Sequence, residues 1–214
     1  MASKMAEQID QALLNLLTQG ILQINEGIDF EISNYIDKAI MLARASGSHP
    51  LQVIINSPGG SLSDSLMIHD ILRSYEGGTT GIVIGESMSG ANLILQGCEV
   101  RIATFGSFLM VHELTVPNKL NILRDKRKFQ EHLDFFVGLQ NKVYRIYQNR
   151  TGKSRRELGC IFKKGKTLTA EMALEYGFLD KVINPEDLVI KTKEDEEEIQ
   201  LDFEQIKKLF KKSK

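Results

Sequence analysis

Short apolar runs alternate with amphipathic segments over the first half of the chain. Runs such as Leu51–Ile55 and Gly81–Ile84 are too short for helices and are typical of buried strands. Segments between them, such as Glu31–Ala45 and Ser63–Tyr75, repeat apolar residues at helical spacing. This alternation predicts an α/β fold of parallel β-α-β units, with sites at the carboxyl ends of the strands. The remaining predicted elements are helices over Ala6–Leu17 and Ala91–Gln96, and strands over Gly20–Asn25, Val100–Ala103 and Phe108–Val111.

A long amphipathic stretch follows between Asn121 and Arg150. It predicts a helix that either projects and packs against another subunit or lies on the sheet with one solvated face. The composition changes after Ile183, because Pro185–Lys214 contains 9 acidic and 7 basic residues, with the acids first and lysines last. We therefore predict one domain over residues 1–184 and a charged C-terminal tail over 185–214.

Composition and charge narrow the classes of function. The chain has 214 residues, of which 42% are hydrophobic and 26% are charged, as in one ordinary globular domain. Its 27 basic and 28 acidic residues leave a net charge of -1, which gives no general attraction for nucleic acid or for an anionic membrane. The two cysteines, Cys98 and Cys160, have no metal-ligand spacing. Since no apolar run approaches a membrane span and no secretory signal is visible, we expect a cytoplasmic protein.

Three of the predicted strands lead into residues that could carry chemistry. INSPGGS over Ile55–Ser61 and GESMSGANLI over Gly85–Ile94 end two strands, and His112 follows a third. Glycines leave backbone N–H groups uncovered by side chains. A hydroxyl, an imidazole base and amide donors are the set that acyl transfer requires. These strand ends therefore predict a site for nucleophilic catalysis.

Four segments, in this order and at these intervals, resemble the proteolytic subunits of the Clp protease family, ClpP. The resemblance covers about residues 20–184. The segments are INSPGGSLSDSLMIHDIL, the stretch from Gly85 to Gly97, SFLMVHE and TAEMALEYGFLDKVI.

The resemblance has implications for fold, activity and partners. It implies a ClpP/crotonase-type spiral of β-α-β units in which the long helix at about 121–150 projects like a handle. It also implies a serine-type endopeptidase that assembles into rings and cleaves peptides or unfolded proteins inside the resulting chamber. An ATP-driven AAA+ unfoldase is the implied partner, so ATP would enter only through that partner. No metal or organic cofactor is implied.

Two ways of counting select different nucleophiles. The family serine lies four residues after a glycine, which gives Ser89, although one residue of the family pattern is missing between Ser89 and Gly90. Counting back from His112 without gaps instead gives Ser87. The small residues that follow Ser89 suit the first turn of a helix and favour it, with Ser87 as the alternative nucleophile or a capping hydroxyl. The resemblance further implies His112 as the base and the amides of Gly60 and Gly90 as the oxyanion hole.

One residue of the family triad is absent. The family has an aspartate that orients the histidine, twelve residues before the glycine that is Gly177 here. In this chain that position is Gly165. A histidine without that aspartate can adopt the wrong tautomer, which costs roughly ten-thousandfold in a serine protease. The outcomes left open are weak activity, another acceptor such as a carbonyl or a nearby side chain, or a catalytically silent ring subunit. A Ser–Lys arrangement that uses the lysines at 163, 164 and 166 is a further alternative.

A second family shares the expected spiral sheet. Gly97–Ala103 resembles a Cys-Asp-x-Arg-Ile-Ala segment of crotonases, which bind acyl-CoA and stabilise an enolate with two backbone N–H groups. Such an enzyme would need no serine nucleophile. The Ser-Pro-Gly-Gly segment and the serine and histidine favour the protease.

Overall fold

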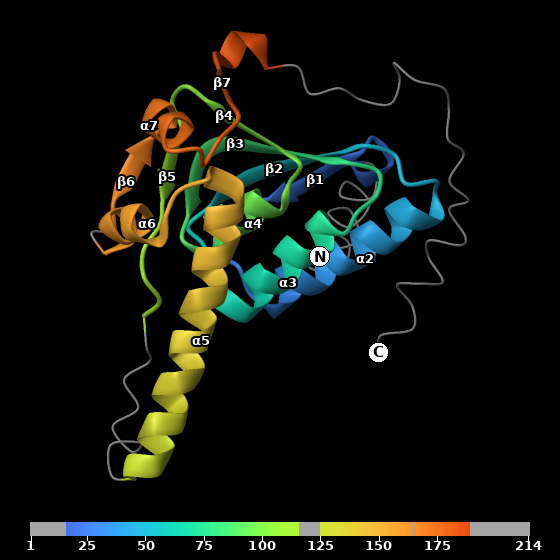
Figure 1. Cartoon of the computed structure of the whole chain (residues 1–214). Coiled ribbons are helices and arrows are strands. Elements are labelled where there is room, and N and C mark those ends of the chain that lie inside the picture. The colour runs from blue at the N-terminus through green and yellow to red at the C-terminus, as the bar shows by residue number, and fades with distance from the viewer. Residues whose placement is uncertain (1–15, 116–124, 164, 189–214) are drawn as a thin grey trace, which may run out of the picture.

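The computed structural model of the chain describes residues 16–115, 125–163 and 165–188. These residues form a sheet of seven strands, in which β1, β2, β3, β4 and β7 are neighbours in that order (Figure 1). β5 pairs with β3 and with β6. All pairs are parallel except β5 with β6, so the predicted α/β fold is confirmed. The strands are β1 (Ile21–Ile24), β2 (Leu51–Ser57), β3 (Thr79–Met88), β4 (Val100–Thr104), β5 (Phe108–Met110), β6 (Thr167–Thr169) and β7 (Lys181–Ile183).

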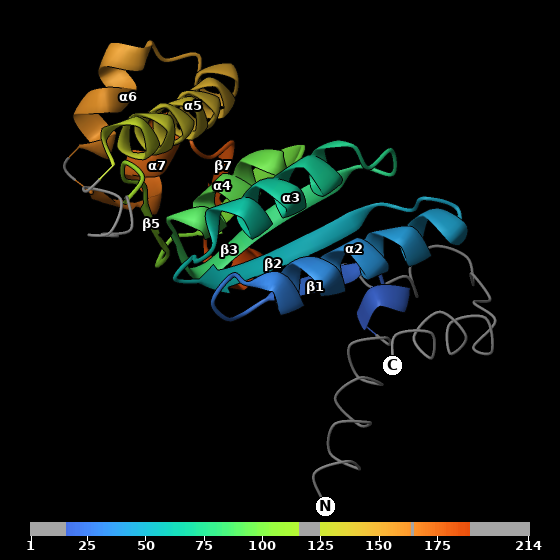
Figure 2. The ribbon, with the colours of Figure 1, turned by 90° about the horizontal axis from the view of Figure 1, so that it is seen from below.

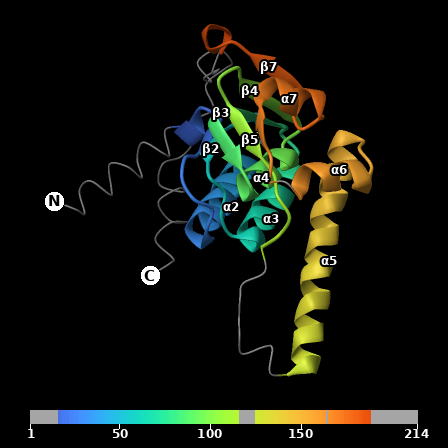
Figure 3. The ribbon, with the colours of Figure 1, turned by 90° about the vertical axis from the view of Figure 1, so that its left-hand side faces the viewer.

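Helices cover the sheet and extend beyond it. α2, α3 and α4 lie side by side along one face of the sheet, and α5 extends away from the rest of the described chain (Figures 2 and 3). No helix within the described ranges has the length and apolar content needed to cross a membrane. The helices are α2 (Phe30–Ala45), α3 (Leu62–Arg73), α4 (Gly90–Gly97), α5 (Lys126–Thr151), α6 (Arg155–Phe162) and α7 (Ala170–Glu175), followed by a short 3-10 helix, η2 (Pro185–Asp187).

The predicted elements are present, with shifted ends. The strand expected to stop at Ile84 continues to Met88. The long helix expected from Asn121 begins at Lys126, because the carboxylate of Asp125 accepts hydrogen bonds from the first N–H groups of α5 as its N-cap. The expected helix over residues 6–17 and the charged tail lie largely outside the described residues. No elements were predicted for the part of the chain that forms α6, β6, α7 and β7.

Side chains on the two faces of the sheet enter different clusters. Val53 and Ile55 on β2 belong to the main core, which the helices complete. Ile54 lies between them and joins Ile21 and Ile82 in a smaller cluster. Because successive residues of a strand point to opposite faces, this smaller cluster lies on the other face of the sheet.

α4 is buried along its whole length and packs closely against α3. A Cβ atom on Gly90 would lie 2.3 Å from Ser65 Oγ, and one on Gly97 would lie 2.6 Å from the carbonyl oxygen of His69. Both distances are shorter than real carbon contacts. The two glycines therefore set how near α4 lies to α3 and where the first turn of α4 sits.

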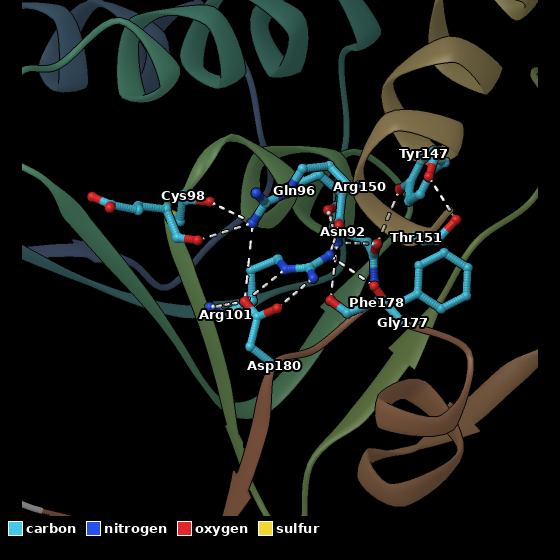
Figure 4. Close-up of polar contacts among 11 residues, drawn as sticks. Asn92, Gln96, Cys98, Arg101, Tyr147, Arg150, Thr151, Gly177, Phe178 and Asp180 are labelled. Carbon is cyan, nitrogen blue, oxygen red and sulfur yellow. Dashed lines mark hydrogen bonds and ion pairs between the residues drawn. The ribbon is translucent and has the colours of Figure 1, made fainter. Parts of the chain in front are cut away.

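A buried arginine links β4 to the segment that enters β7. Arg101 is 4% exposed, and its Nε and Nη2 atoms donate to the two carboxylate oxygens of Asp180 at 3.0 and 2.6 Å (Figure 4). Arg101 also donates to Gln96 Oε1 at 2.6 Å and to the carbonyl of Gly177 at 2.8 Å. The hydrogen bond from Arg101 holds the pKa of Asp180 below its ordinary value, against the opposing effect of partial burial. The end of α4 is thereby tied to the connection between α7 and β7.

We expect Asp180→Asn to lower the free energy of unfolding at neutral pH by about 2 kcal/mol, because a buried guanidinium loses its charged partner. The carboxyl has a lower pKa when folded than its unfolded value of about 3.9. Its contribution is therefore complete above that value and is lost as the pH falls through the folded-state pKa. Denaturant unfolding of both proteins, from neutral pH down to about pH 3, measures the difference.

The matched control is Asp134→Asn at an exposed position of α5. It should change stability by less than about 0.5 kcal/mol. A difference between the wild type and Asp180→Asn that stays constant as the pH falls would contradict the assigned role of the ion pair.

Candidate active site

One edge of β3 changes its partner along the strand, while the other edge pairs with β2. Thr80–Val83 pairs with β4, whereas Glu86–Met88 pairs with β5. Gly85 lies between the two parts with a φ of +96°, and a Cβ atom there would lie 2.5 Å from Asn56 Oδ1. Asn56 Oδ1 also accepts a hydrogen bond from the N–H of Glu86 at 3.2 Å. The strand therefore turns at the glycine and continues, where its apolar pattern alone predicted an end.

The pairing of β3 with β5 brings two strand ends together. Met88 and Met110 are partners in this parallel pair. Ser89 follows the first strand directly, and its N–H donates to the carbonyl of Met110 at 2.8 Å. His112 follows β5 two residues after Met110, so Ser89 and His112 leave the same edge of the sheet.

The backbone turns sharply at Ser89, between β3 and α4. Its φ is +50° and its ψ is -117°, a conformation that costs about 1–3 kcal/mol for a residue with a side chain. The surrounding structure holds it there, because the carbonyl of Ser89 accepts hydrogen bonds from the N–H groups of Asn92 and Leu93. Such strained strand-to-helix turns expose the side chain of the residue at the corner.

Ser89 and His112 are in direct contact. Ser89 Oγ lies 2.8 Å from His112 Nε2, at hydrogen-bond distance. Ser87 is fully buried on β3, and its Oγ has no hydrogen-bond partner within the described ranges. The structure therefore brings Ser89 to the imidazole and keeps Ser87 inside the fold.

The other ring nitrogen of His112 contacts the main chain. Nδ1 lies 2.5 Å from the carbonyl oxygen of Glu113. A carbonyl only accepts hydrogen bonds, so Nδ1 must carry a proton, and the Nε2 of the neutral ring is then an acceptor for the hydroxyl of Ser89. A carbonyl acceptor was one of the alternatives for the absent aspartate, but every residue has a carbonyl, so its position could not be predicted from the sequence.

The position expected for an aspartate is a glycine that lies near His112 Cβ and supplies no carboxylate. A Cβ atom on Gly165 would lie 3.9 Å from His112 Cβ, which is an ordinary contact. Lys166, one of the candidates for a Ser–Lys arrangement, instead points to Tyr176, with Nζ 3.5 Å from the phenol oxygen. Lys163 is exposed, and the lysine at 164 lies outside the described residues.

Two glycine amides lie next to Ser89. A Cβ atom on Gly59 would lie 3.0 Å from Ser89 Cβ, and one on Gly90 would lie 3.4 Å from the nitrogen of Gly60. Neither Gly60 nor Gly90 donates an N–H hydrogen bond to any described residue. The arrangement therefore offers amide donors to negative charge that develops beside the hydroxyl. No group of three or more His, Cys, Asp or Glu side chains in the described part of the chain could hold a metal ion.

Comparison with known families tests the resemblance. The model of the family described as Clp protease matches residues 4–186. The chain belongs to the Clp protease family. The family predicted from the sequence is confirmed, and the crotonase alternative is set aside.

Curated relatives carry names that agree with this family. An ATP-dependent Clp protease proteolytic subunit of Ostreococcus tauri is 29% identical over 177 residues, which cover 80% of this chain and 85% of the relative. A protein of the same name from Chlorella vulgaris is 28% identical over 170 residues, or 78% of this chain and 83% of the relative. ATP-dependent Clp protease proteolytic subunit 1 of Protochlamydia amoebophila (strain UWE25) is 29% identical over 187 residues, or 85% and 87%. The predicted class, a Clp-type serine peptidase, is supported by these relatives.

We expect Gly60→Ala to lower the free energy of unfolding by about 1–3 kcal/mol. The added Cβ would lie 2.2 Å from the carbonyl oxygen of Ile28, a backbone atom that cannot move aside without breaking the bridge between these two segments. Denaturant unfolding measures the loss. Gly106→Ala is the matched control, because a Cβ atom at that position meets nothing within 4 Å. Equal stability of the two variants would contradict the tight packing at Gly60.

Proposed function

We propose that this member of the Clp protease family is a serine endopeptidase in which Ser89 is the nucleophile and His112 is the general base. The contact between Ser89 Oγ and His112 Nε2 carries the proposal. Ser87 does not meet the same requirement, since its hydroxyl is buried away from the imidazole.

The proposed reaction begins with attack of Ser89 Oγ on a peptide carbonyl carbon. His112 Nε2 takes the hydroxyl proton as the bond forms and returns it to the leaving amine. The negative charge on the former carbonyl oxygen is stabilised by the N–H groups of Gly60 and Gly90. Water then attacks the acyl-enzyme, with His112 again accepting a proton, and releases the second product.

The main-chain carbonyl of Glu113 takes part of the role of the absent aspartate. It keeps the proton on Nδ1, so it prevents the tautomer error that makes the loss of a triad acid so costly. A neutral carbonyl stabilises the imidazolium less than a carboxylate does, because its partial charge is smaller. We therefore expect active but slow chemistry.

The proposal extends to assembly and partners. Clp proteases in general form oligomers and work with unfoldases, and we propose ring assembly, cleavage of peptides or unfolded chains inside the chamber, and an AAA+ unfoldase as the ATP-using partner. No metal or organic cofactor has a part in the proposed reaction. A cytoplasmic location and the division at residue 184 stay predictions.

A fluorophosphonate probe should label the wild type at Ser89, because the probe reacts with a serine that a base activates. We expect labelling to be lost in Ser89→Ala. It should persist in Ser87→Ala, which removes a buried hydroxyl that has no hydrogen-bond partner among the described residues. Gel fluorescence with mass spectrometry of the labelled peptide identifies the site.

Labelling that instead disappears in Ser87→Ala would move the nucleophile to that residue. A native, assembled wild type that neither labels nor hydrolyses peptides, with or without an unfoldase, would favour the catalytically silent ring subunit. Light scattering establishes the assembly state used in the measurement.

Gly165→Asp should raise kcat/KM for a peptide substrate by about threefold to tenfold, because its Cβ atom would lie 3.9 Å from His112 Cβ and its carboxylate would then be within reach of the imidazole. The φ of +52° at this position is one that Asp and Asn adopt more readily than other side chains. Gly165→Asn is therefore the matched control, with the same shape and no charge. Equal rates for the two variants would contradict the view that the weak acceptor limits the chemistry.

A further inference from the structure

One peptide group connects the imidazole to the projecting helix. The carbonyl of the Glu113–Leu114 peptide faces His112 Nδ1, and the N–H of the same peptide donates to Gln140 Oε1 at 2.7 Å. A peptide group is a rigid plane, so a hydrogen bond that fixes its N–H also fixes the direction of its C=O. The orientation of the acceptor for His112 therefore depends on Gln140.

Gln140 makes no second polar contact with the described residues. The side chain is half-buried on α5, and its Nε2 atom is buried with no hydrogen-bond partner in the described part of the chain. The hydrogen bond from Leu114 is thus the one polar contact that the side chain makes with described residues. A buried amide nitrogen without a partner is costly, so the residue is a poor choice for stability alone.

The side chain of Glu113 is held by the next turn of the same helix. Tyr144 lies four residues beyond Gln140, and its hydroxyl donates to Glu113 Oε1 at 3.2 Å. The ring of Tyr144 is itself fixed, because it stacks on Phe162 and lies 4.2 Å from the guanidinium carbon of Arg155. α5 therefore holds residue 113 at two points: Tyr144 binds its side chain, and Gln140 binds the peptide group that follows it. These two contacts limit how far the carbonyl can rotate.

We propose that Gln140 is a positioning residue for catalysis: through the Glu113–Leu114 peptide it holds the carbonyl that orients His112. The inference rests on the proposed function, since it assigns a partner to the same imidazole. α5 thereby supplies, through the main chain, the orientation that a carboxylate at position 165 would supply directly.

The first test is Gln140→Leu in the full-length, assembled protein. This change removes the acceptor for the Leu114 N–H and keeps most of the side-chain volume. We expect kcat for a fluorogenic peptide to fall about tenfold to a hundredfold, because a small misplacement of a catalytic group has effects of that size. KM should stay within about twofold, since Gln140 touches no substrate-binding group in the proposal. The rate of fluorophosphonate labelling at Ser89 should fall in parallel with kcat.

Gln130→Leu is the matched control on the same helix. Gln130 is exposed, and its amide donates to Asp134 one turn away, far along α5 from the site. It should leave kcat and the labelling rate unchanged. Light scattering and thermal unfolding of both variants separate a change in chemistry from a loss of assembly or of folding. If Gln140→Leu does not fold, Gln140→Asn replaces it, because it keeps the amide but shortens its reach.

A double variant distinguishes positioning from a merely structural role. With Gly165→Asp present, a carboxylate can hold Nδ1 directly, so Gln140→Leu should then cost less than about threefold in kcat. A structural role predicts the same loss in both backgrounds. That result, or a Gln140→Leu protein that labels and hydrolyses at the wild-type rate, would overturn the inference while leaving the proposed function intact. A wild type that neither labels nor hydrolyses would overturn both.

Discussion

The change of partner along β3 is the constraint on which the site depends. Its first half pairs with β4 and builds the sheet, while its last residues pair with β5 and carry the chain to Ser89. Because that second pairing is parallel and in a fixed register, it also determines where His112 emerges. The hydroxyl and the imidazole meet since two strands end together, and the bend at Gly85 makes this possible.

The fold was predictable where local patterns decide it. Alternating apolar runs and amphipathic segments indicated parallel β-α-β units, and these are present. The predicted end of β3 was wrong, because Glu86–Met88 lacks an apolar pattern and is held as a strand by pairing with β5 and, at Ser87, with β2. Elements beyond residue 151 were not assigned. β6 and β7 have three residues each, too few for a periodic pattern to identify.

The residue types of the candidate site could be proposed from the sequence, but the geometry of that site could not. The segments at Gly60, Gly90 and His112 were identified, but the choice between Ser87 and Ser89 depends on which hydroxyl points into the core. That direction is set by the pleat of β3 and by the positive φ at Ser89, and neither can be read from residue spacing. The contact of the Glu113 carbonyl with His112 was equally inaccessible to sequence analysis, because it follows from the path of the main chain after β5.

The main-chain acceptor of His112 also affects how a sequence such as this one should be interpreted. A single nucleotide change can remove a carboxylate side chain. A substitution at position 113 cannot remove the main-chain carbonyl, because every amino acid has one. Selection on such a site would act on the course of the backbone and on the side chains that hold it, such as Gln140 and Tyr144. Searches that count triad side chains would classify this chain as a pseudoenzyme, although its histidine has the acceptor that fixes the required tautomer.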